Sequence, residues 1–209
     1  MEIKVDKLIV RLEQKDDYKE VENLTREAFW DVYRPGCTEH LVLHKLRGSK
    51  SFISDLDYVF VMDDKIIANI VYTKMFNEKG EMLDDVIAFG PVSVHPECQK
   101  RGIGKSIIQI SIEVAKELGY KAILITGNDK FYNRLGFQGA YKYGVTLPGM
   151  SVEDKAEFFM AMELEEGYLS KHSGVYDFDP LFNVTDEELE KFELEFPKKS
   201  KREPRETDL

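Results

Sequence analysis

The chain has few of the features that would cross-link its fold or place it in a membrane. It contains only two cysteines, Cys37 and Cys98, which argues against a disulfide framework. No apolar run approaches the roughly 20 residues that a membrane span needs. The first residues also carry charges where a secretory signal would be apolar. These absences predict a cytoplasmic protein with no membrane partner.

The chain also has fewer positively charged than negatively charged residues. The 209 residues include 29 lysines and arginines against 39 aspartates and glutamates, for a formal net charge of −10. Nucleic acids are bound mainly through lysine and arginine contacts to phosphates, so nucleic acid is excluded as the main partner. A cationic small molecule or peptide suits this charge better. Hydrophobic residues make up 43% of the chain, which is enough for one globular core.

Hydrophobic periodicity predicts a mixed order of strands and helices. The predicted strands cover residues 8–12, 58–62, 66–72, 86–94, 122–126 and 158–164, and the predicted helices cover 18–29, 38–47, 102–118 and 130–135. Gly90-Pro91 predicts an interruption in its strand. Residues 86–126 form a βαβ unit, for which a right-handed crossover is expected. A loop is expected over 142–151.

The composition changes after Leu164, where apolar residues become sparse. We therefore predict one α/β domain over residues 1–165 and a C-terminal extension over 166–196. A capping box formed by Thr185 and Glu188 opens a short helix in that extension. Alternating charges predict a disordered tail over 197–209.

The stretch that joins the strand 86–94 to the helix 102–118 has the composition of an anion-binding turn. Gly102 and Gly104 lack a Cβ where the chain enters the helix, so several backbone amides can point at one anion. The helix N-terminus adds a partial positive charge. Lys100, Arg101 and Lys105 add three cations to the same turn. This combination predicts a diphosphate cradle.

Two commoner phosphate motifs do not fit this turn. Gly104-Lys105-Ser106 is similar to the end of a P-loop, but that motif requires glycine where this chain has Gln99. A dinucleotide GxGxxG motif that starts at Gly102 requires glycine where this chain has Ile107. The cradle therefore belongs to another type.

Residues 92–96 and 99–104 together resemble the acetyl-CoA signature of the GNAT superfamily of N-acetyltransferases, Q/R-x-x-G-x-G/A. Residues 131–137, Phe-Tyr-Asn-Arg-Leu-Gly-Phe, resemble the second landmark of that family. The resemblance covers roughly Leu8 to Leu164 and is closest to a subgroup with a GPVSVHPE-QKRGIG core. It implies the GNAT fold, an α/β fold in which a mixed central sheet with a splayed parallel strand pair is flanked by helices.

The resemblance also implies acetyl-CoA as cosubstrate and no metal. The strand at Val92–Val94 would splay from its neighbour at 124–126 and hold the pantetheine arm through free backbone groups. Tyr132 corresponds to the tyrosine that protonates the leaving thiolate, and the backbone of Val94 is expected to contact the oxyanion. The implied cofactor-binding residues are Val92, Ser93, Val94, Gln99, Lys100, Arg101, Gly102, Ile103, Gly104, Lys105, Ser106 and Asn133.

The general base stays open. Its candidates are Glu27, Asp84, Asp85 and His95, with a water chain as a further option. A lysine-like amine with a pKa near 10.4 would need such a base, whereas an α-amine with a pKa near 7.7 to 8.0 barely does.

An acceptor pocket is expected between residues 30–36 and 142–151. Trp30, Tyr33, Tyr141 and Met150 would form its walls, and Arg34 could hold an acidic group. The acceptor would be a small-molecule or peptide amine.

Two functions fit these residues. The first is an N-acetyltransferase that moves an acetyl group to a primary amine by direct transfer in a ternary complex. The alternative is an acyl-CoA-binding regulatory or sensor module without turnover. Either function is compatible with a homodimer. Cys37, His40 and His44 lack an evident fourth zinc ligand, and Cys98 lacks a base partner.

Overall fold

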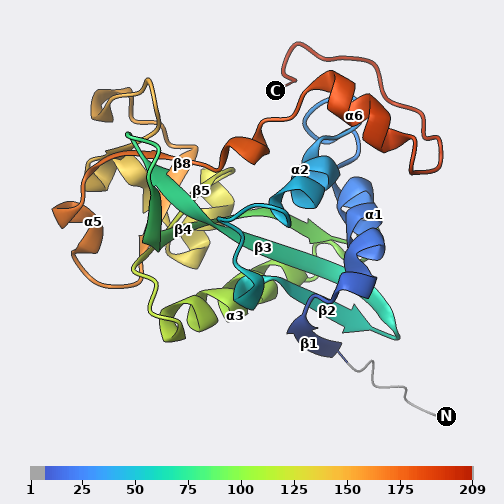
Figure 1. Cartoon of the computed structure of the whole chain (residues 1–209), viewed down its shortest axis with the longest axis horizontal. Coiled ribbons are helices and arrows are strands. Elements are labelled where there is room, and N and C mark those ends of the chain that lie inside the picture. Colours follow the sequence, from blue (N-terminus) through green and yellow to red (C-terminus); the bar gives the residue numbers. More distant parts are fainter. Residues whose placement is uncertain (1–7, 209) are drawn as a thin grey trace.

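A computed structural model describes residues 8–208 and contains a twisted sheet with helices on both faces (Figure 1). The strands are β1 (Leu8–Leu12), β2 (Tyr58–Met62), β3 (Lys65–Asn77), β4 (Met82–Val94), β5 (Ala122–Thr126), β6 (Gln138–Gly139), β7 (Val145–Thr146), β8 (Phe159–Glu163) and β9 (Gly174–Asp177). The helices are α1 (Tyr18–Phe29), α2 (Glu39–Leu46), α3 (Ile103–Glu117), α4 (Asp129–Tyr132), α5 (Tyr168–Lys171) and α6 (Asp186–Glu193). The loop predicted over 142–151 contains β7 and the end of a 3-10 turn, Ala140–Tyr143.

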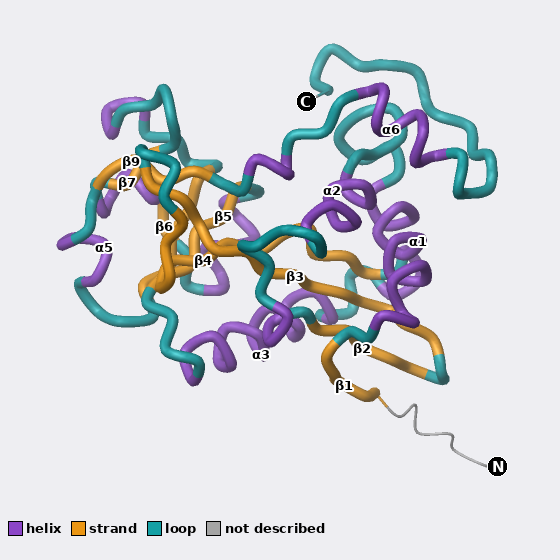
Figure 2. The backbone as a smooth tube through the Cα atoms, viewed as in Figure 1, coloured by secondary structure: helices purple, strands orange, loops and turns teal. Residues whose placement is uncertain are grey.

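The main path of the sheet runs β1-β2-β3-β4-β5-β8-β6 (Figure 2). Along this path β4 and β5 are parallel, and every other pair is antiparallel. The helix α3 connects β4 to β5 and completes the predicted βαβ unit. The predicted mixed α/β fold class is confirmed.

The parallel pair β4–β5 separates halfway along β4. Its register runs from Val86 opposite Ala122 to Ala88 opposite Leu124, and no further pairing with β5 follows within residues 8–208. Beyond Ala88, β4 continues to Val94 alongside β3 alone. The register with β3 shifts where Gly90 and Pro91 lie, as the sequence predicted. A gap between two neighbouring strands results.

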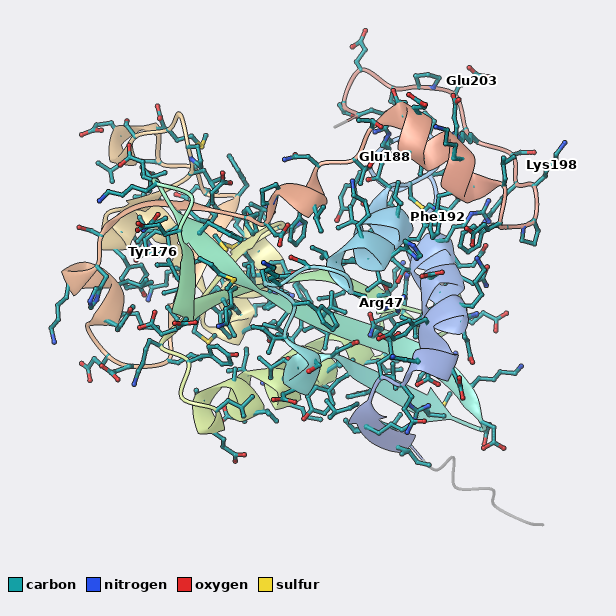
Figure 3. The ribbon with its side chains drawn as sticks, in the orientation of Figure 1. Arg47, Tyr176, Glu188, Phe192, Lys198 and Glu203 are labelled. Atoms are coloured by element: carbon teal, nitrogen blue, oxygen red, sulfur yellow. The ribbon has the colours of Figure 1, made fainter. Side chains whose placement is uncertain are left out.

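The C-terminal extension completes the sheet and its core. Its strand β9 pairs with β3, with Asp177 opposite Phe76. Leu169 and Tyr176 are buried, so residue 165 marks no boundary of the packed core. Figure 3 shows Phe192 on the side of α6 nearest α2, where it packs against Leu41.

Residues 197–208, for which the sequence predicts disorder, run beside the end of α1 in the structure. Polar contacts hold them there, including a 2.6 Å ion pair between Lys199 and Glu27. We refer to residues 197–208 as the C-terminal arm.

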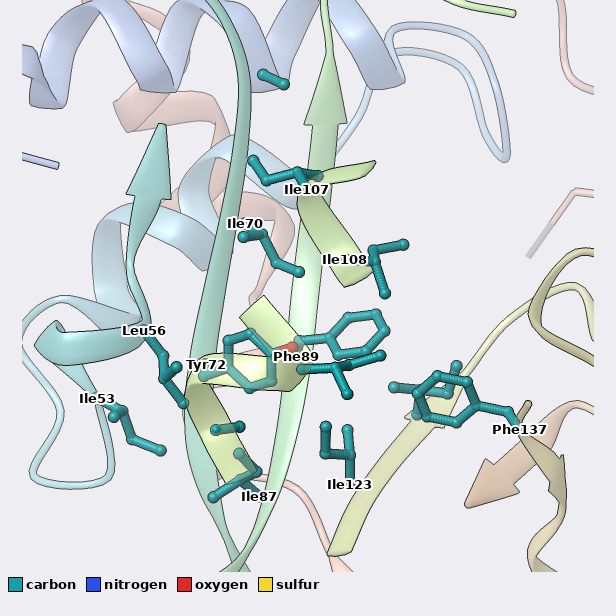
Figure 4. Close-up of a cluster of buried hydrophobic side chains, with 14 of the residues drawn as sticks. Ile53, Leu56, Ile70, Tyr72, Ile87, Phe89, Ile107, Ile108, Ile123 and Phe137 are labelled. Atoms are coloured by element: carbon teal, nitrogen blue, oxygen red, sulfur yellow. The ribbon is translucent and has the colours of Figure 1, made fainter. Parts of the chain in front are cut away.

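The two faces of the sheet carry separate apolar clusters because alternate residues of a strand point to opposite sides. On one face, Ile107 and Ile108 of α3 pack with Ile70, Tyr72 and Ile87 (Figure 4). The other face has one cluster beneath α1 and α2 and a second beneath the C-terminal extension. No helix in the described part of the chain has the length and apolar character needed to cross a bilayer.

Candidate active site

The turn between β4 and α3 has the backbone form that the glycines suggested. Gly102 has a left-handed φ of +86°, which favours glycine although a Cβ there would meet nothing within 4 Å. Lys100 also has a left-handed φ, of +61°. A Cβ at Gly104 would lie 3.5 Å from Cγ2 of Val94, an ordinary contact. The N-terminus of α3 therefore lies against the last residue of β4.

The backbone amides of this turn are free to bind. Within residues 8–208 no acceptor is found for the amides of residues 100–105. The first amide with a partner is that of Ser106, which donates to the carbonyl of Gly102 at 2.9 Å. Lys100, Arg101 and Lys105 are exposed, and none of them forms an ion pair with a residue of the described chain. Free amides and unpaired cations are the groups that a polyanion site requires.

The free half of β4 presents more backbone donors to the gap. The amide of His95 donates to Ile67 of β3 at 2.8 Å. Because hydrogen-bonded pairs alternate in an antiparallel ladder, Ser93 faces β3 as well, whereas the amides of Val92 and Val94 face away from β3. The carbonyl of Val94 accepts from the side chain of Gln99 at 3.1 Å. The gap is therefore lined by the amides of Val92 and Val94.

Two residues of the predicted cofactor set have side chains used elsewhere. The side chain of Gln99 closes the turn through its bond to Val94. The hydroxyl of Ser93 donates to Thr25 Oγ1 of α1 at 2.8 Å. The Ser93 hydroxyl is therefore directed at α1, and the Gln99 amide nitrogen at β4.

Tyr132 lies at the other end of the gap, at the end of α4. Its ring packs against Phe89 of β4 at 5.9 Å and against Phe137 at 5.8 Å between centroids. Burial, and then the nearby Tyr33, raise the pKa of Tyr132 to about 12. The phenol therefore keeps its proton at neutral pH and can donate it. Asn133, the next residue, is exposed.

The sequence reasoning missed two residues that position Tyr132. A Cβ at Gly127, directly after β5, would lie 2.7 Å from Cε2 of the Tyr132 ring. Phe89 forms the other wall, just after the point where β4 and β5 separate. A glycine between a buried strand and a helix was visible in the sequence, but its ring contact was not.

Each base candidate makes a polar contact with another group of the chain. His95 Nδ1 accepts from the amide of Glu97 at 3.3 Å, and Glu27 pairs with Lys199 of the C-terminal arm. Asp85 accepts from Tyr168 at 2.6 Å. Asp84 pairs with Lys74 at 2.5 Å. At about 3.3 Å per residue, the four steps along β4 place Asp85 about 13 Å from Phe89, against which Tyr132 packs. The geometry therefore selects none of the four candidates as the base.

The predicted acceptor wall is only partly assembled. Trp30 Nε1 donates to the carbonyl of Ser200 at 2.9 Å, and Arg34 pairs with Asp186 at 3.2 Å. Both side chains thus bind the C-terminal region instead of lining a pocket. Tyr33 is 49% exposed and lies near Tyr132. Met150 and Tyr141 line a small apolar cavity. The lining of this cavity includes none of Trp30, Tyr33 and Arg34.

Cys37 and His40 are buried beneath α6 and form a row with Glu193 of that helix, which is partly exposed. Cys37 Sγ lies 3.4 Å from His40 Nδ1, and His40 Nε2 lies 2.8 Å from Glu193 Oε1. His44 contacts Glu22 instead, so the three candidate zinc ligands do not converge. Burial raises the pKa of the Cys37 thiol and lowers that of His40 to about 4, so both groups are neutral. Cys98 is buried as well.

Comparisons with known proteins agree with this geometry. A family model described as an acetyltransferase (GNAT) domain matches residues 55–139. The uncharacterized N-acetyltransferase YhbS of Escherichia coli is 22% identical over 84% of this chain and 99% of its own length. A second uncharacterized N-acetyltransferase of that organism, YjhQ, is 30% identical over 36% of this chain and 42% of its own length.

Two solved structures share the fold over most of the chain. The crystal structure of YhbS from Escherichia coli in complex with CoA has a TM-score of 0.75 and 20% identity, and covers 88% of this chain and 96% of its own. A GNAT family acetyltransferase from Brucella melitensis in complex with acetyl-CoA has a TM-score of 0.68 and 21% identity, and covers 85% and 99%. The family model matches residues 55–139, which hold both sequence motifs, and the two solved structures show that the chain shares their fold.

Proposed function

We propose that this protein is an acetyl-CoA-dependent N-acetyltransferase that moves an acetyl group to a primary amine by direct transfer in a ternary complex. One observation carries the proposal: the gap between β4 and β5 has free backbone amides and cations at one end and a protonated tyrosine at the other. The acceptor is a small-molecule or peptide amine. The cytoplasmic location inferred from the sequence stays a prediction.

The residues around the gap fit acetyl-CoA. The amides of residues 100–105, with Lys100, Arg101 and Lys105, are suited to its pyrophosphate. The amides of Val92 and Val94 are suited to the polar groups of its pantetheine arm. The relatives from Escherichia coli and Brucella melitensis, solved with CoA and acetyl-CoA, support this assignment. When bound, acetyl-CoA would supply the reactive thioester.

The roles of Tyr132 and the β4 backbone follow from which residues of β4 lie nearest to Tyr132. Phe89, which packs against Tyr132, is three residues from Val92 and five from Val94. The amide of Val92 is therefore better placed than that of Val94 to stabilise the oxyanion, which shifts this role from the residue that the sequence suggested. Tyr132 gives its proton to the leaving sulfur as the C–S bond breaks and the C–N bond forms. The proton lost by the amine then returns to the phenolate through water.

The engagement of the base candidates bears on the class of acceptor. Glu27, Asp85 and His95 are bonded to other groups of the chain. An amine that is already partly neutral suits such a site best. At pH 7 an α-amine with a pKa near 7.7 to 8.0 is neutral in roughly one molecule in ten, against about one in 2,500 for a lysine-like amine. We therefore propose an acceptor amine of low pKa.

Thiol release from acetyl-CoA tests the proposal. We would measure it with glycinamide, spermidine and a lysine-containing peptide whose α-amine is blocked, and measure CoA affinity by calorimetry. Turnover that is fastest with glycinamide and is lost in Tyr132→Phe is the expected result. CoA binding without turnover on any amine, and without an effect of Tyr132→Phe, would point instead to a binding or sensor module.

A further inference from the structure

The turn of residues 30–36 connects α1 to α2 and carries Tyr33, which is near enough to contribute to the raised pKa of Tyr132. Its position is linked to the gap through α1, because Thr25 of α1 accepts a hydrogen bond from Ser93 of β4 at 2.8 Å. Tyr33 is half exposed, and its ring lies 6.2 Å from that of Phe29 at the end of α1. The turn is therefore joined to the β4 side of the gap through α1.

Asp31 sets the conformation of the turn. Its φ of +62° is left-handed, which a residue other than glycine adopts only when its surroundings hold it there. The Asp31 amide donates to the carbonyl of Gly36 at 2.9 Å, and Oδ1 of Asp31 accepts from the amide of Gly36 at 2.8 Å. These two bonds close the turn at its base.

Arg202 of the C-terminal arm donates hydrogen bonds to two further acceptor atoms of Asp31. The amide of Arg202 donates to Asp31 Oδ2 at 3.1 Å, and Arg202 Nε donates to the Asp31 carbonyl at 2.9 Å. The same guanidinium is held in place by Asp208, which accepts from Nη1 at 2.9 Å and also from Nη2. Arg202 is thus fixed between the turn and the end of the arm.

The arm holds the turn at further points. The carbonyl of Ser200 accepts from Trp30, and the aliphatic part of Lys201 lies close over Gly36. Lys199 binds Glu27 one turn earlier on α1. Figure 3 shows Lys198 and Glu203 beyond α6, on the outer side of this region. The arm therefore contacts residues at both ends of the turn.

These contacts differ from those that stabilise the core. No side chain of the arm is fully buried, in contrast to Leu189, Phe192 and Phe196 just before it. The arm therefore adds polar contacts to one turn and little apolar burial to the whole fold. Loss of its contacts should change that turn and leave the sheet and helices in place.

We propose that the C-terminal arm is a positioning element of the acceptor site, in which Arg202 holds Asp31 and thereby the turn that presents Tyr33 opposite Tyr132. This inference rests on the proposed acetyl transfer. Arg202 acts through the turn as a positioning residue, whereas Tyr33 is the side chain that would meet the acceptor. Because the arm lies outside the residues that match the family model, the site would owe part of its specificity to a segment outside that domain.

Arg202→Ala tests the inference in the full chain. Glycinamide, spermidine and the lysine peptide serve as acceptor probes. We expect the KM for the accepted amine to rise about tenfold, the effect of losing a charge-assisted hydrogen bond, while CoA affinity and kcat stay close to those of the wild type. Arg202→Lys, which keeps the charge but not the guanidinium geometry, should recover part of the loss.

Lys191→Ala is the matched control, since its pair with Glu187 lies on the exposed surface of α6. It should change none of these values. Trp30 is the only tryptophan of the chain, so its emission reports on the arm directly and should move to longer wavelength in Arg202→Ala. An unchanged acceptor KM, or an equal loss in KM, kcat and CoA affinity, would overturn the inference. A wild-type protein that binds no CoA would refute the proposed function and the inference with it.

Discussion

The ring of Tyr132 fills the space that a side chain at Gly127 would need, since a Cβ there would lie 2.7 Å from Cε2 of the ring. Gly127→Ala should therefore push the ring away from the gap. We expect kcat to fall about tenfold or more, because a small misplacement of a proton donor slows its transfer. Calorimetry should show an unchanged CoA affinity, since the cradle lies at the other end of the gap.

The matched control is Gly48→Ala. A Cβ at Gly48 would meet only the carbonyl of Lys45, at an ordinary 3.5 Å. This variant should keep its activity. Equal kcat values for the two variants would show that the ring position does not matter.

Tyr132 should act as an acid over the whole range in which the fold is stable. Its pKa is raised to about 12, chiefly by burial, so the protonated donor is present below that pH and is lost only above it. The kcat profile should therefore show no basic limb from this group below about pH 11. Tyr132→Phe should lower kcat by about 10² to 10⁴. Tyr120→Phe, at the far end of α3, is the control and should leave kcat unchanged.

Two substitutions of Gly104 should separate the effect of charge from the effect of side-chain volume on CoA binding in the cradle. A side chain there meets only Val94, at 3.5 Å, so the fold accepts one. Gly104→Asp places a negative charge among the free amides and should abolish CoA binding in calorimetry. Gly104→Asn has nearly the same shape without the charge, and should weaken binding by less. Equal losses in both variants would assign the effect to bulk alone, and normal CoA binding by Gly104→Asp would refute the cradle.

The predictions from sequence were most successful where one local signal decides the structure. The stripe of isoleucines in α3, the apolar strand β5 and the glycines at residues 102 and 104 specify their own conformations. The conformation of this turn and the βαβ unit therefore follow from the sequence. The parallel pairing and the gap follow from the resemblance to the GNAT superfamily.

Contacts between distant residues were not predictable in this way. The bond from Trp30 to Ser200 joins two segments that have no periodicity in common. The tail reads as disordered because its residues are charged, yet those charges meet Glu27 and Asp31 on the folded surface. The bond from Tyr168 to Asp85 likewise joins two segments far apart in the sequence.

A buried carboxyl pair was missed for the same reason, and it predicts how stability depends on pH. Glu13 and Asp57 come together beside Arg47, with Asn69 donating to Asp57 at 3.0 Å. Burial, and then the hydrogen bond with Asp57, raise the pKa of Glu13 from 4.5 to about 9. The native state thus keeps a proton that the unfolded state releases between about pH 4.5 and 9. The free energy of unfolding should therefore fall as the pH rises through that window.

Glu13→Gln should flatten this dependence, since glutamine does not titrate. Urea unfolding at pH 5.5, 7 and 9 would measure it, with Glu117→Gln on the exposed side of α3 as control. We expect the free energy of unfolding of the variant to increase relative to that of the wild type as the pH rises. Parallel slopes for wild type and variant would contradict the raised pKa of Glu13.

The pairing of β9 with β3 has a consequence for how the chain is made. The ribosome synthesises β3 long before residues 166–182, so the part of the sheet face that these residues cover stays exposed in the meantime. An apolar sheet face exposed in this way invites association with other chains. Nascent chains halted before Leu169 should therefore need chaperones far more than chains released at full length.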